Sequence, residues 1–347
     1  MIQTVSESRP ARVPRHLLVA GSAWGSRIVT AVVQLVSVRI LMQILGLDGY
    51  AAFALLAGLV GWFSLSDFGM GTSLQNYISE RRASDSDYED LIGLVGLLSS
   101  ALLLGLLGAF YLLSPHMGPL FFQNVHFLSD AQKSRLFFVN GVMLSGYGVG
   151  SIAYKIWYAE HQGHLANIAP ALAALCGLGG LLLVRAAIPV EPLLVSVAVF
   201  VGPTAVLPLG ALLLRSARAA ARTGRGGNKQ AGMALMRRAL RFWCFALMSA
   251  AILQVDYIVM SQFLPAHDIA IYNLSTKIFG LAFFIYNAVL MALWPVLAEA
   301  FSRRQWGVAD AYLRKYLGLG LSFMALCTLA LLWLMPVVVG LLAPGQA

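Results

Sequence analysis

Apolar segments long enough to cross a lipid bilayer recur along the whole chain, and this feature limits the possible folds more than any other. About 20 helical residues span the hydrocarbon core of a membrane. The sequence predicts such helices over residues 17–45, 51–79, 91–113, 135–160, 165–185, 192–214, 239–264, 269–297 and 316–342. Only 11% of the 347 residues are charged, against about 25% in soluble globular proteins. We therefore predict an all-α polytopic membrane protein, a helical bundle with about nine transmembrane helices.

Basic residues are concentrated in alternate loops. Most of the 24 lysines and arginines fall in the N-terminal tail, after the second predicted helix, between helices six and seven, and after helix eight. The loops between them contain only Lys133, Arg135 and Arg185. Since cytoplasmic loops retain positive charge, this pattern predicts a cytoplasmic N-terminus. It also accounts for the net charge of +9 without nucleic-acid binding, which would need bases clustered with aromatic residues.

The longest polar segment, residues 215–238, follows the sixth predicted helix and is rich in glycine and basic residues. Such a composition is typical of a flexible linker, with binding of lipid headgroups as the alternative. We interpret the chain as a cytoplasmic basic tail (1–16), a first lobe of six helices (17–214), a basic cytoplasmic linker (215–238) and an incomplete second lobe of three helices (239–347). An even number of helices before the linker allows the second lobe to repeat the first.

Several charged residues lie inside the predicted helices, among them Arg27, Asp67, Asp256 and Lys277. A charge near the bilayer centre costs at least about 2.5 kcal/mol, so such a side chain usually faces the protein interior or a wet cavity. Counted from the outer helix ends, Arg27 and Asp67 lie at similar depth, and so do Asp256 and Lys277. We therefore predict two intramembrane pairs, Arg27 with Asp67 and Asp256 with Lys277.

The same charges predict a cavity for an anionic substrate. Arg27 and Gln34 share a helix face, as do Asn273 and Lys277. We expect Arg27, Gln34, Asp67, Asn273 and Lys277 to line this cavity, with the planar Arg27 guanidinium binding a pyrophosphate or an acidic sugar. The alternative is that these polar groups only hold the helices together. Asp67 and Asp256 are also candidates for coupling transport to an H⁺ or Na⁺ gradient.

The sequence contains no arrangement typical of catalysis. His161 and His164 lie in a loop without further ligands, and the three cysteines lie apart in apolar segments, whereas a catalytic metal needs about three protein ligands. No GxxxxGK[ST] phosphate-binding motif is present. We expect no enzymatic activity, no metal and no other cofactor.

Short motifs in both halves of the chain resemble one family of bacterial membrane proteins. They are RILMQILG at residues 39–46, LSDFGMG at 65–71 and DYIVM at 256–260. These motifs are similar to those of the bacterial polysaccharide flippases, the Wzx-type O-antigen transporters of the multidrug, oligosaccharidyl-lipid and polysaccharide exporter superfamily. Members of this family usually have twelve to fourteen helices in two lobes, so the resemblance implies that the last part of the second lobe is missing here.

The resemblance implies a transporter of the bacterial inner membrane. Such a transporter flips an undecaprenyl-pyrophosphate-linked oligosaccharide, an O-antigen or exopolysaccharide unit, from the cytoplasmic to the periplasmic leaflet by alternating access. Its partners would be this lipid-linked substrate, membrane lipids and other polysaccharide-assembly proteins. Two alternatives remain: an ion-coupled multidrug-type exporter, which would need a carboxylate-rich cavity, and a non-transporting scaffold or fragment of polysaccharide assembly.

Overall fold

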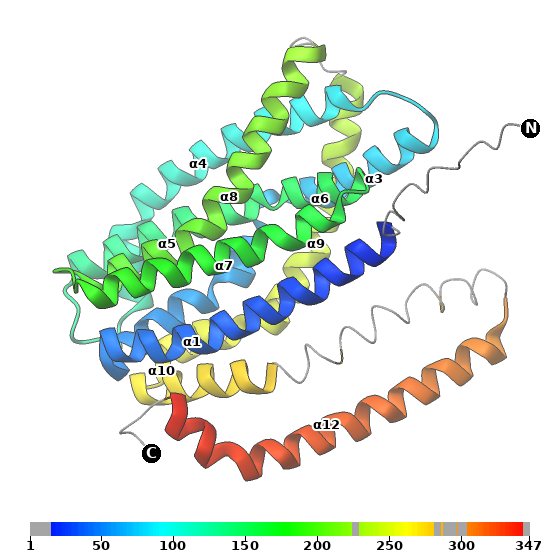
Figure 1. Ribbon diagram of the computed structural model, residues 1–347. Coiled ribbons are helices and arrows are strands. Elements are labelled where there is room, and N and C mark those ends of the chain that lie inside the picture. Colours follow the sequence, from blue (N-terminus) through cyan, green and yellow to red (C-terminus); the bar gives the residue numbers. More distant parts are fainter. Residues whose placement is uncertain (1–14, 224–228, 281–285, 287–296, 298–303, 343–347) are drawn as a thin grey trace, which may run out of the picture.

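The computed structural model describes residues 15–223, 229–280, 286, 297 and 304–342, and this part of the chain is helical without any strand (Figure 1). The elements are α1 (Arg15–Gly58), α2 (Val60–Phe63), the 3₁₀ helix η1 (Ser64–Asp67), α3 (Met70–Ala83), α4 (Glu89–Phe121), α5 (Asp130–Gly150), α6 (Ile152–Ala159), α7 (Gly163–Ala186), α8 (Pro192–Thr223), α9 (Lys229–Leu253), α10 (Val255–Phe263) and α12 (Trp306–Leu342). Residues 266–280 form a further helix, called helix 266–280 below.

Within the described residues, six helices are long and apolar enough to cross a membrane, or seven if the bent pair α9–α10 counts as one span. The prediction of an all-α polytopic bundle is confirmed. The count differs from the predicted nine for two reasons. Most of the predicted helix 17–45 and the first part of the predicted helix 51–79 lie in one apolar segment, Gly21–Asp67. The predicted helix 269–297 lies largely outside the described residues beyond position 280.

The segment Gly21–Asp67 crosses the bundle twice. Its 47 residues would extend about 70 Å as one straight helix, more than twice the thickness of the hydrocarbon core. Gly46 interrupts it with non-helical angles, φ 68° and ψ −175°. Ser22, before this bend, contacts Asn167 near the start of α7, and Asp67, after it, lies near Lys155 close to the end of α6. The chain therefore turns back at Gly46, so the segments predicted as helices 17–45 and 51–79 form a helical hairpin.

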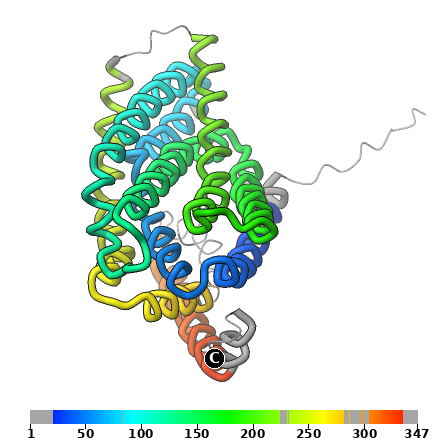
Figure 2. The backbone as a smooth tube through the Cα atoms, turned by 90° about the vertical axis from the view of Figure 1, so that its left-hand side faces the viewer, coloured from blue at the N-terminus to red at the C-terminus, as the bar shows by residue number. Residues whose placement is uncertain are grey.

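The two ends of the bundle are named here by their turns. The Gly46 end carries the bend at Gly46 and the loop between α4 and α5. The Ser84 end carries the turn between α3 and α4 and the turn between α6 and α7 (Figure 1). α8 and α9 extend to the Ser84 end, where they protrude from the bundle (Figure 2).

The returning half of the hairpin is broken, whereas a continuous helix over residues 51–79 was predicted. Two short elements, α2 and η1, lead from α1 to Phe68 and Gly69, which have φ angles of 48° and 75°. A Cβ at Gly69 would lie 2.2 Å from the carbonyl oxygen of Ala239 on α9. Glycine allows both the left-handed angle and this close approach, so the break lets α9 pack tightly against the start of α3.

Ordered helix covers most of the segment that was predicted as a linker, residues 215–238. α8 continues to Thr223 and α9 begins at Lys229. Residues 224–228 of the predicted linker, and residues 1–14 of the predicted tail, lie outside the described residues.

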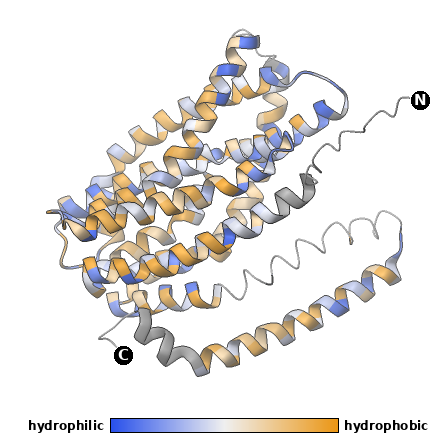
Figure 3. Ribbon diagram, viewed as in Figure 1, coloured by the Kyte–Doolittle hydropathy of each residue, from blue (hydrophilic) through white to orange (hydrophobic). Residues whose placement is uncertain are grey.

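Apolar side chains form two buried clusters and also cover the outside of the bundle. One cluster, around Leu41, Tyr50 and Leu193, lies toward the Gly46 end, and the other, around Leu74 and Ile152, lies toward the Ser84 end. Hydrophobic residues extend along the outer helix surfaces (Figure 3). A soluble monomer rarely exposes apolar patches of this extent, so lipid is the natural surrounding of these surfaces.

Candidate functional site

A cavity of about 480 Å³ lies between α1, the α6–α7 region and helix 266–280, and is called the α1 cavity below. α1 supplies nearly half of its lining, at positions three or four residues apart that share one helix face. The described lining residues are Ala23, Ser26, Arg27, Thr30, Ala31, Gln34, Tyr158, Ala166, Asn167, Pro170, Thr276, Lys277 and Gly280.

Two of the described lining residues of the α1 cavity are charged, and both are basic. Arg27 reaches it from α1 and Lys277 from helix 266–280, and none of the described lining residues is acidic. Gln34 lines the same space. The structure thus brings together Arg27, Gln34 and Lys277, three of the five residues that the sequence predicted for one cavity. Two basic groups, with no carboxylate among the described lining residues, favour an anionic ligand.

A chain of hydrogen bonds fixes the neutral side of the cavity. The Tyr158 hydroxyl donates to Oδ1 of Asn167 at 2.5 Å, and Nδ2 of Asn167 donates to Oγ of Ser22 at 3.2 Å. The charge of Arg27 acts on Tyr158, so the basic and neutral sides adjoin. These contacts hold α6, α7 and α1 together at the cavity wall.

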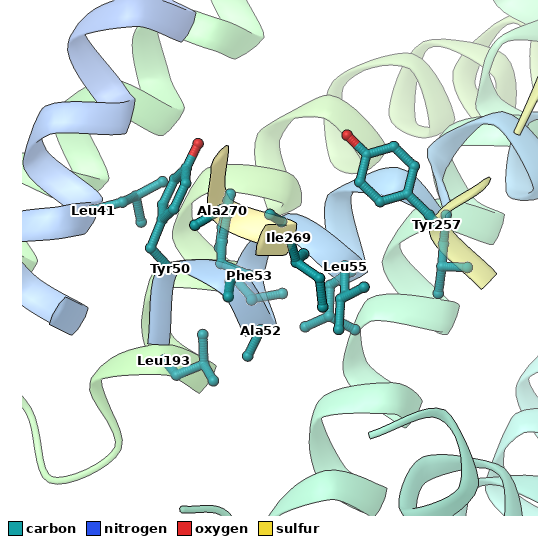
Figure 4. Close-up of a cluster of buried hydrophobic side chains, with 14 of the residues drawn as sticks. Leu41, Tyr50, Ala52, Phe53, Leu55, Leu193, Tyr257, Ile269 and Ala270 are labelled. Carbon is teal, nitrogen blue, oxygen red and sulfur yellow. The ribbon is translucent and has the colours of Figure 1, made fainter. Parts of the chain in front are cut away.

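Asn273 lies in the packed core rather than among the lining residues of the α1 cavity. Its Oδ1 accepts a hydrogen bond from the Tyr50 hydroxyl at 2.7 Å, and its Nδ2 donates to the Tyr257 hydroxyl at 2.8 Å. The two tyrosines come from different helices and flank the segment with Ile269 and Ala270 (Figure 4). Asn273 therefore links three helices at a buried polar junction that closes the cavity toward the Gly46 end.

Asp67 occupies a different place from the one predicted. Its carboxylate accepts hydrogen bonds from the backbone N–H groups of Gly69 at 2.9 Å and Gly71 at 3.1 Å. Such a carboxylate caps a helix start, here that of α3, and the basic residue whose charge acts on it is Lys155. The predicted ion pair with Arg27 is wrong, because the break between α1 and α3 turns Asp67 toward α6.

Asp256 and Lys277 also have separate partners. Asp256 accepts hydrogen bonds from the Tyr272 hydroxyl and from the backbone N–H of Tyr257. The Lys277 ammonium lies over the ring of Tyr50. Within the described residues no ion pair joins Asp256 to Lys277, so this prediction is wrong as well. Equal depth along two helices does not fix the direction in which their side chains point, and the bend at Gln254 changes that direction further.

Amide side chains close the Gly46 end between the α4–α5 loop and α10. Nε2 of Gln123 donates to the carbonyl oxygen of Gln262 at 3.1 Å, and Nε2 of Gln262 donates to that of Leu120 at 3.0 Å. Nδ2 of Asn124 donates to the carbonyl oxygen of Ser261 at 3.3 Å. The two halves of the chain are therefore in direct contact at this end.

At the Ser84 end, the Arg215 guanidinium forms hydrogen bonds with both carboxylate oxygens of Glu89, at 2.6 and 2.8 Å, and with Glu160 at 2.8 Å. This network joins α8, the start of α4 and the end of α6 beside an open pocket of about 820 Å³. Burial raises the pKa of the nearby Tyr88 phenol, and the Glu160 carboxylate raises it further, so the phenol stays neutral. The carboxylates balance the arginines here, which distinguishes this pocket from the α1 cavity.

Two polar residues of the cavity, Tyr158 and Asn167, were not predicted from the sequence. Both are uncharged, whereas the predicted cavity residues were found from intramembrane charges and their neighbours on the same helix face. Asn167 did carry a usable signal, because an amide within a predicted membrane helix needs a hydrogen-bonding partner.

No protein-family model matches the chain, but curated bacterial proteins are similar to it. A protein of Yersinia pseudotuberculosis named "Putative O-antigen export protein" is 37% identical over 337 residues, which cover 96% of the chain and 77% of that protein. A "Putative O-antigen transporter" of Salmonella typhi is 38% identical over 341 residues, 97% of the chain and 77% of that protein. A protein of the same name in Salmonella typhimurium strain LT2 is 37% identical over 319 residues, which cover 92% of the chain and 73% of that protein.

Proposed function

The chain belongs to the family of these O-antigen transporters, and from this we infer that it carries a lipid-linked polysaccharide unit across a bacterial membrane as a multi-pass protein. The proposed membrane is the inner one. The proposed substrate is an undecaprenyl-pyrophosphate-linked oligosaccharide, which passes from the cytoplasmic to the periplasmic leaflet. No chemical change of the substrate is needed for this step, so we propose transport without enzymatic activity.

The observation that carries this proposal is the pair of basic residues in the α1 cavity. A pyrophosphate is anionic, and the Arg27 guanidinium and the Lys277 ammonium both reach the same space. Charge-assisted hydrogen bonds to phosphate are among the stronger polar contacts in proteins. The apolar tail of the lipid would stay in the bilayer while the head occupies the cavity.

The proposed orientation places the Ser84 end in the cytoplasm. This end carries Arg81, Arg82, Arg215, Arg218 and Arg222, as expected for cytoplasmic segments. The amide contacts of the Gly46 end then close the periplasmic side, so this conformer is closed toward the periplasm. Separation of residues 17–214 from residues 239–347 at these contacts would open the outer side, which is how we propose that two lobes alternate.

The α1 cavity disfavours the alternative function of a multidrug-type exporter. An exporter of small cationic drugs needs acidic lining residues, and the described lining of this cavity is basic and neutral. A scaffold that assists other polysaccharide-assembly proteins without transport would need no cationic cavity at all.

We propose Asp256, rather than Asp67, as the residue that couples transport to H⁺ or Na⁺. Asp67 is engaged by two backbone N–H groups in a helix cap, whereas Asp256 accepts from one backbone N–H group, that of Tyr257, and from the hydroxyl of Tyr272. A hydroxyl can rotate away when an ion binds, while a helix cap is fixed by the backbone. Asp256→Asn is expected to remove the dependence of transport on the ion gradient, and a gradient response that survives it contradicts this assignment.

The cavity is tested in cells that lack their own copy of this transporter. Surface polysaccharide is measured after expression of the native chain, Arg27→Ala or Lys277→Met, with equal amounts of each protein in the membrane. Arg39→Ala is the matched control, because Arg39 is an exposed arginine on the same helix that does not line the cavity. We expect a loss of at least tenfold for both cavity variants and none for the control. Full surface polysaccharide with both cavity variants would contradict the assignment of the substrate site.

A further inference from the structure

One wall of the α1 cavity differs chemically from the side that carries Arg27 and Lys277. It consists of Tyr158, Ala166, Asn167 and Pro170, and is called the α6–α7 wall. Tyr158 is 41% exposed, so part of its ring is accessible. Ionised phosphate oxygens accept hydrogen bonds and have no proton to donate. A wall built from an aromatic ring and neutral groups therefore suits a different part of a ligand.

A proline interrupts the backbone hydrogen bonding of α7 at this wall. Pro170 lies inside α7 and has no N–H group. The carbonyl of Ala166, four residues earlier, consequently does not receive its usual helical hydrogen bond. Both residues line the cavity. The Tyr158 hydroxyl donates its proton to Asn167, and its oxygen keeps lone pairs that can accept. The accessible acceptor of the wall is thus the Tyr158 oxygen, which matches a ligand hydroxyl and not phosphate.

The position of these groups is fixed before any ligand binds. The hydrogen bonds from Tyr158 to Asn167 and from Asn167 to Ser22 tie the ring and the amide to α1. A site whose side chains are held by their neighbours loses little conformational entropy on binding. The volume of about 480 Å³ is within the range of about 300–1,000 Å³ that is usual for small-molecule sites.

We propose that the α6–α7 wall binds the sugar next to the pyrophosphate and so selects the glycosylated lipid over the bare lipid pyrophosphate. This proposal rests on the function proposed above. The Tyr158 ring packs against the C–H face of the sugar, while the Tyr158 oxygen accepts a hydrogen bond from one of its hydroxyls. Arg27 and Lys277 bind the pyrophosphate, which both lipids share. Discrimination therefore comes from the neutral wall.

The test compares two probes on the purified full chain in lipid nanodiscs. One probe is undecaprenyl pyrophosphate, and the other is the lipid-linked oligosaccharide extracted from the native host. Dissociation constants are measured for the native chain and for Tyr158→Phe, Asn167→Leu and Arg27→Ala. Tyr111→Phe is the matched control, because Tyr111 is exposed on α4 away from the cavity.

The native chain is expected to bind the glycosylated lipid about tenfold more tightly than the bare lipid, as the loss of one or two hydrogen bonds predicts. Each wall variant should reduce or remove this difference and leave the affinity for the bare lipid within twofold. Equal affinity of the native chain for both probes, or an equal loss for both probes in the wall variants, would overturn the proposal. If Arg27→Ala changes neither affinity, the proposed function itself fails, which is a separate outcome.

Discussion

The ammonium nitrogen of Lys277 lies 5.8 Å from the centroid of the Tyr50 ring. The hydroxyl of the same tyrosine donates a hydrogen bond to Asn273, which lies one helical turn before Lys277. Tyr50 is completely buried. A single aromatic side chain thus connects a cationic group of the α1 cavity to the polar junction that closes the Gly46 end. Substitutions of Tyr50 separate these two contacts.

Tyr50→Phe keeps the ring and removes the hydroxyl. Oδ1 of buried Asn273 then loses its donor, and we expect the free energy of unfolding to fall by about 1–3 kcal/mol. Tyr50→Leu also removes the cation–π contact, which adds about 0.5–2 kcal/mol. Denaturant unfolding in detergent micelles measures both, with Tyr111→Phe as the exposed control that should change stability by less than about 0.5 kcal/mol. A Tyr50→Phe variant as stable as the native chain would contradict the role of the junction.

Gly69→Ala should be strongly destabilising. The residue has a φ of 75°, and an added Cβ would meet the backbone oxygen of Ala239 at 2.2 Å. Because a backbone atom cannot move aside as a side chain can, we expect a loss of more than about 2 kcal/mol in the free energy of unfolding. Gly21→Ala is the control, since nothing lies within 4 Å of its added Cβ, and it should be neutral or slightly stabilising. Similar stability of the two variants would show that α9 does not pack against Gly69.

Arg215→Met should loosen the Ser84 end. It breaks the two-oxygen contact with Glu89 and the contact with Glu160, whose half-buried carboxylates then lack this partner. The expected loss is about 1–3 kcal/mol, between the values for exposed and buried ion pairs. Arg314→Met removes an exposed pair with Asp310 one turn away and should cost less than about 0.5 kcal/mol. Thermal unfolding of both variants side by side checks the difference, and equal midpoints would refute it.

Asp67→Ala removes the cap of α3. The two backbone N–H groups that it accepts from lose their partner, with an expected cost of about 1–2 kcal/mol in the free energy of unfolding. Asp67→Asn keeps one carbonyl oxygen as an acceptor, so its cost should be smaller. Hydrogen exchange of the Gly69 and Gly71 amides, followed by mass spectrometry, reports the change locally. Unchanged exchange in Asp67→Ala would contradict the cap.

The sequence allowed the membrane class and much of the cavity to be predicted. Apolar runs of sufficient length have few other stable environments, so the helical bundle follows from composition and periodicity. Arg27 and Gln34 are seven residues apart and share a helix face whatever the tertiary packing, and both line the α1 cavity. Lys277 was predicted to line a cavity because a charge inside a membrane helix is costly unless it faces the protein interior or a wet cavity.

The partners of the charges could not be predicted, because they depend on how each helix is rotated about its axis. Depth along the helix paired Asp67 with Arg27, but the left-handed backbone at Phe68 and Gly69 turned the carboxylate toward Lys155. No local sequence pattern predicts such a break within a long apolar segment. The neutral residues Tyr158 and Asn167 gave too weak a signal beside intramembrane charge, although they form the cavity wall.

The most direct test of the account is translocation of the lipid-linked oligosaccharide, extracted from the native host and fluorescently labelled, in proteoliposomes that contain only this chain. Arg27→Ala is compared with the native chain and with Arg39→Ala. We expect the native chain and Arg39→Ala to move the lipid between leaflets and Arg27→Ala to slow this movement at least tenfold. Movement at the same rate in all three, or no movement with correctly folded native chain, would contradict transport through the cationic α1 cavity.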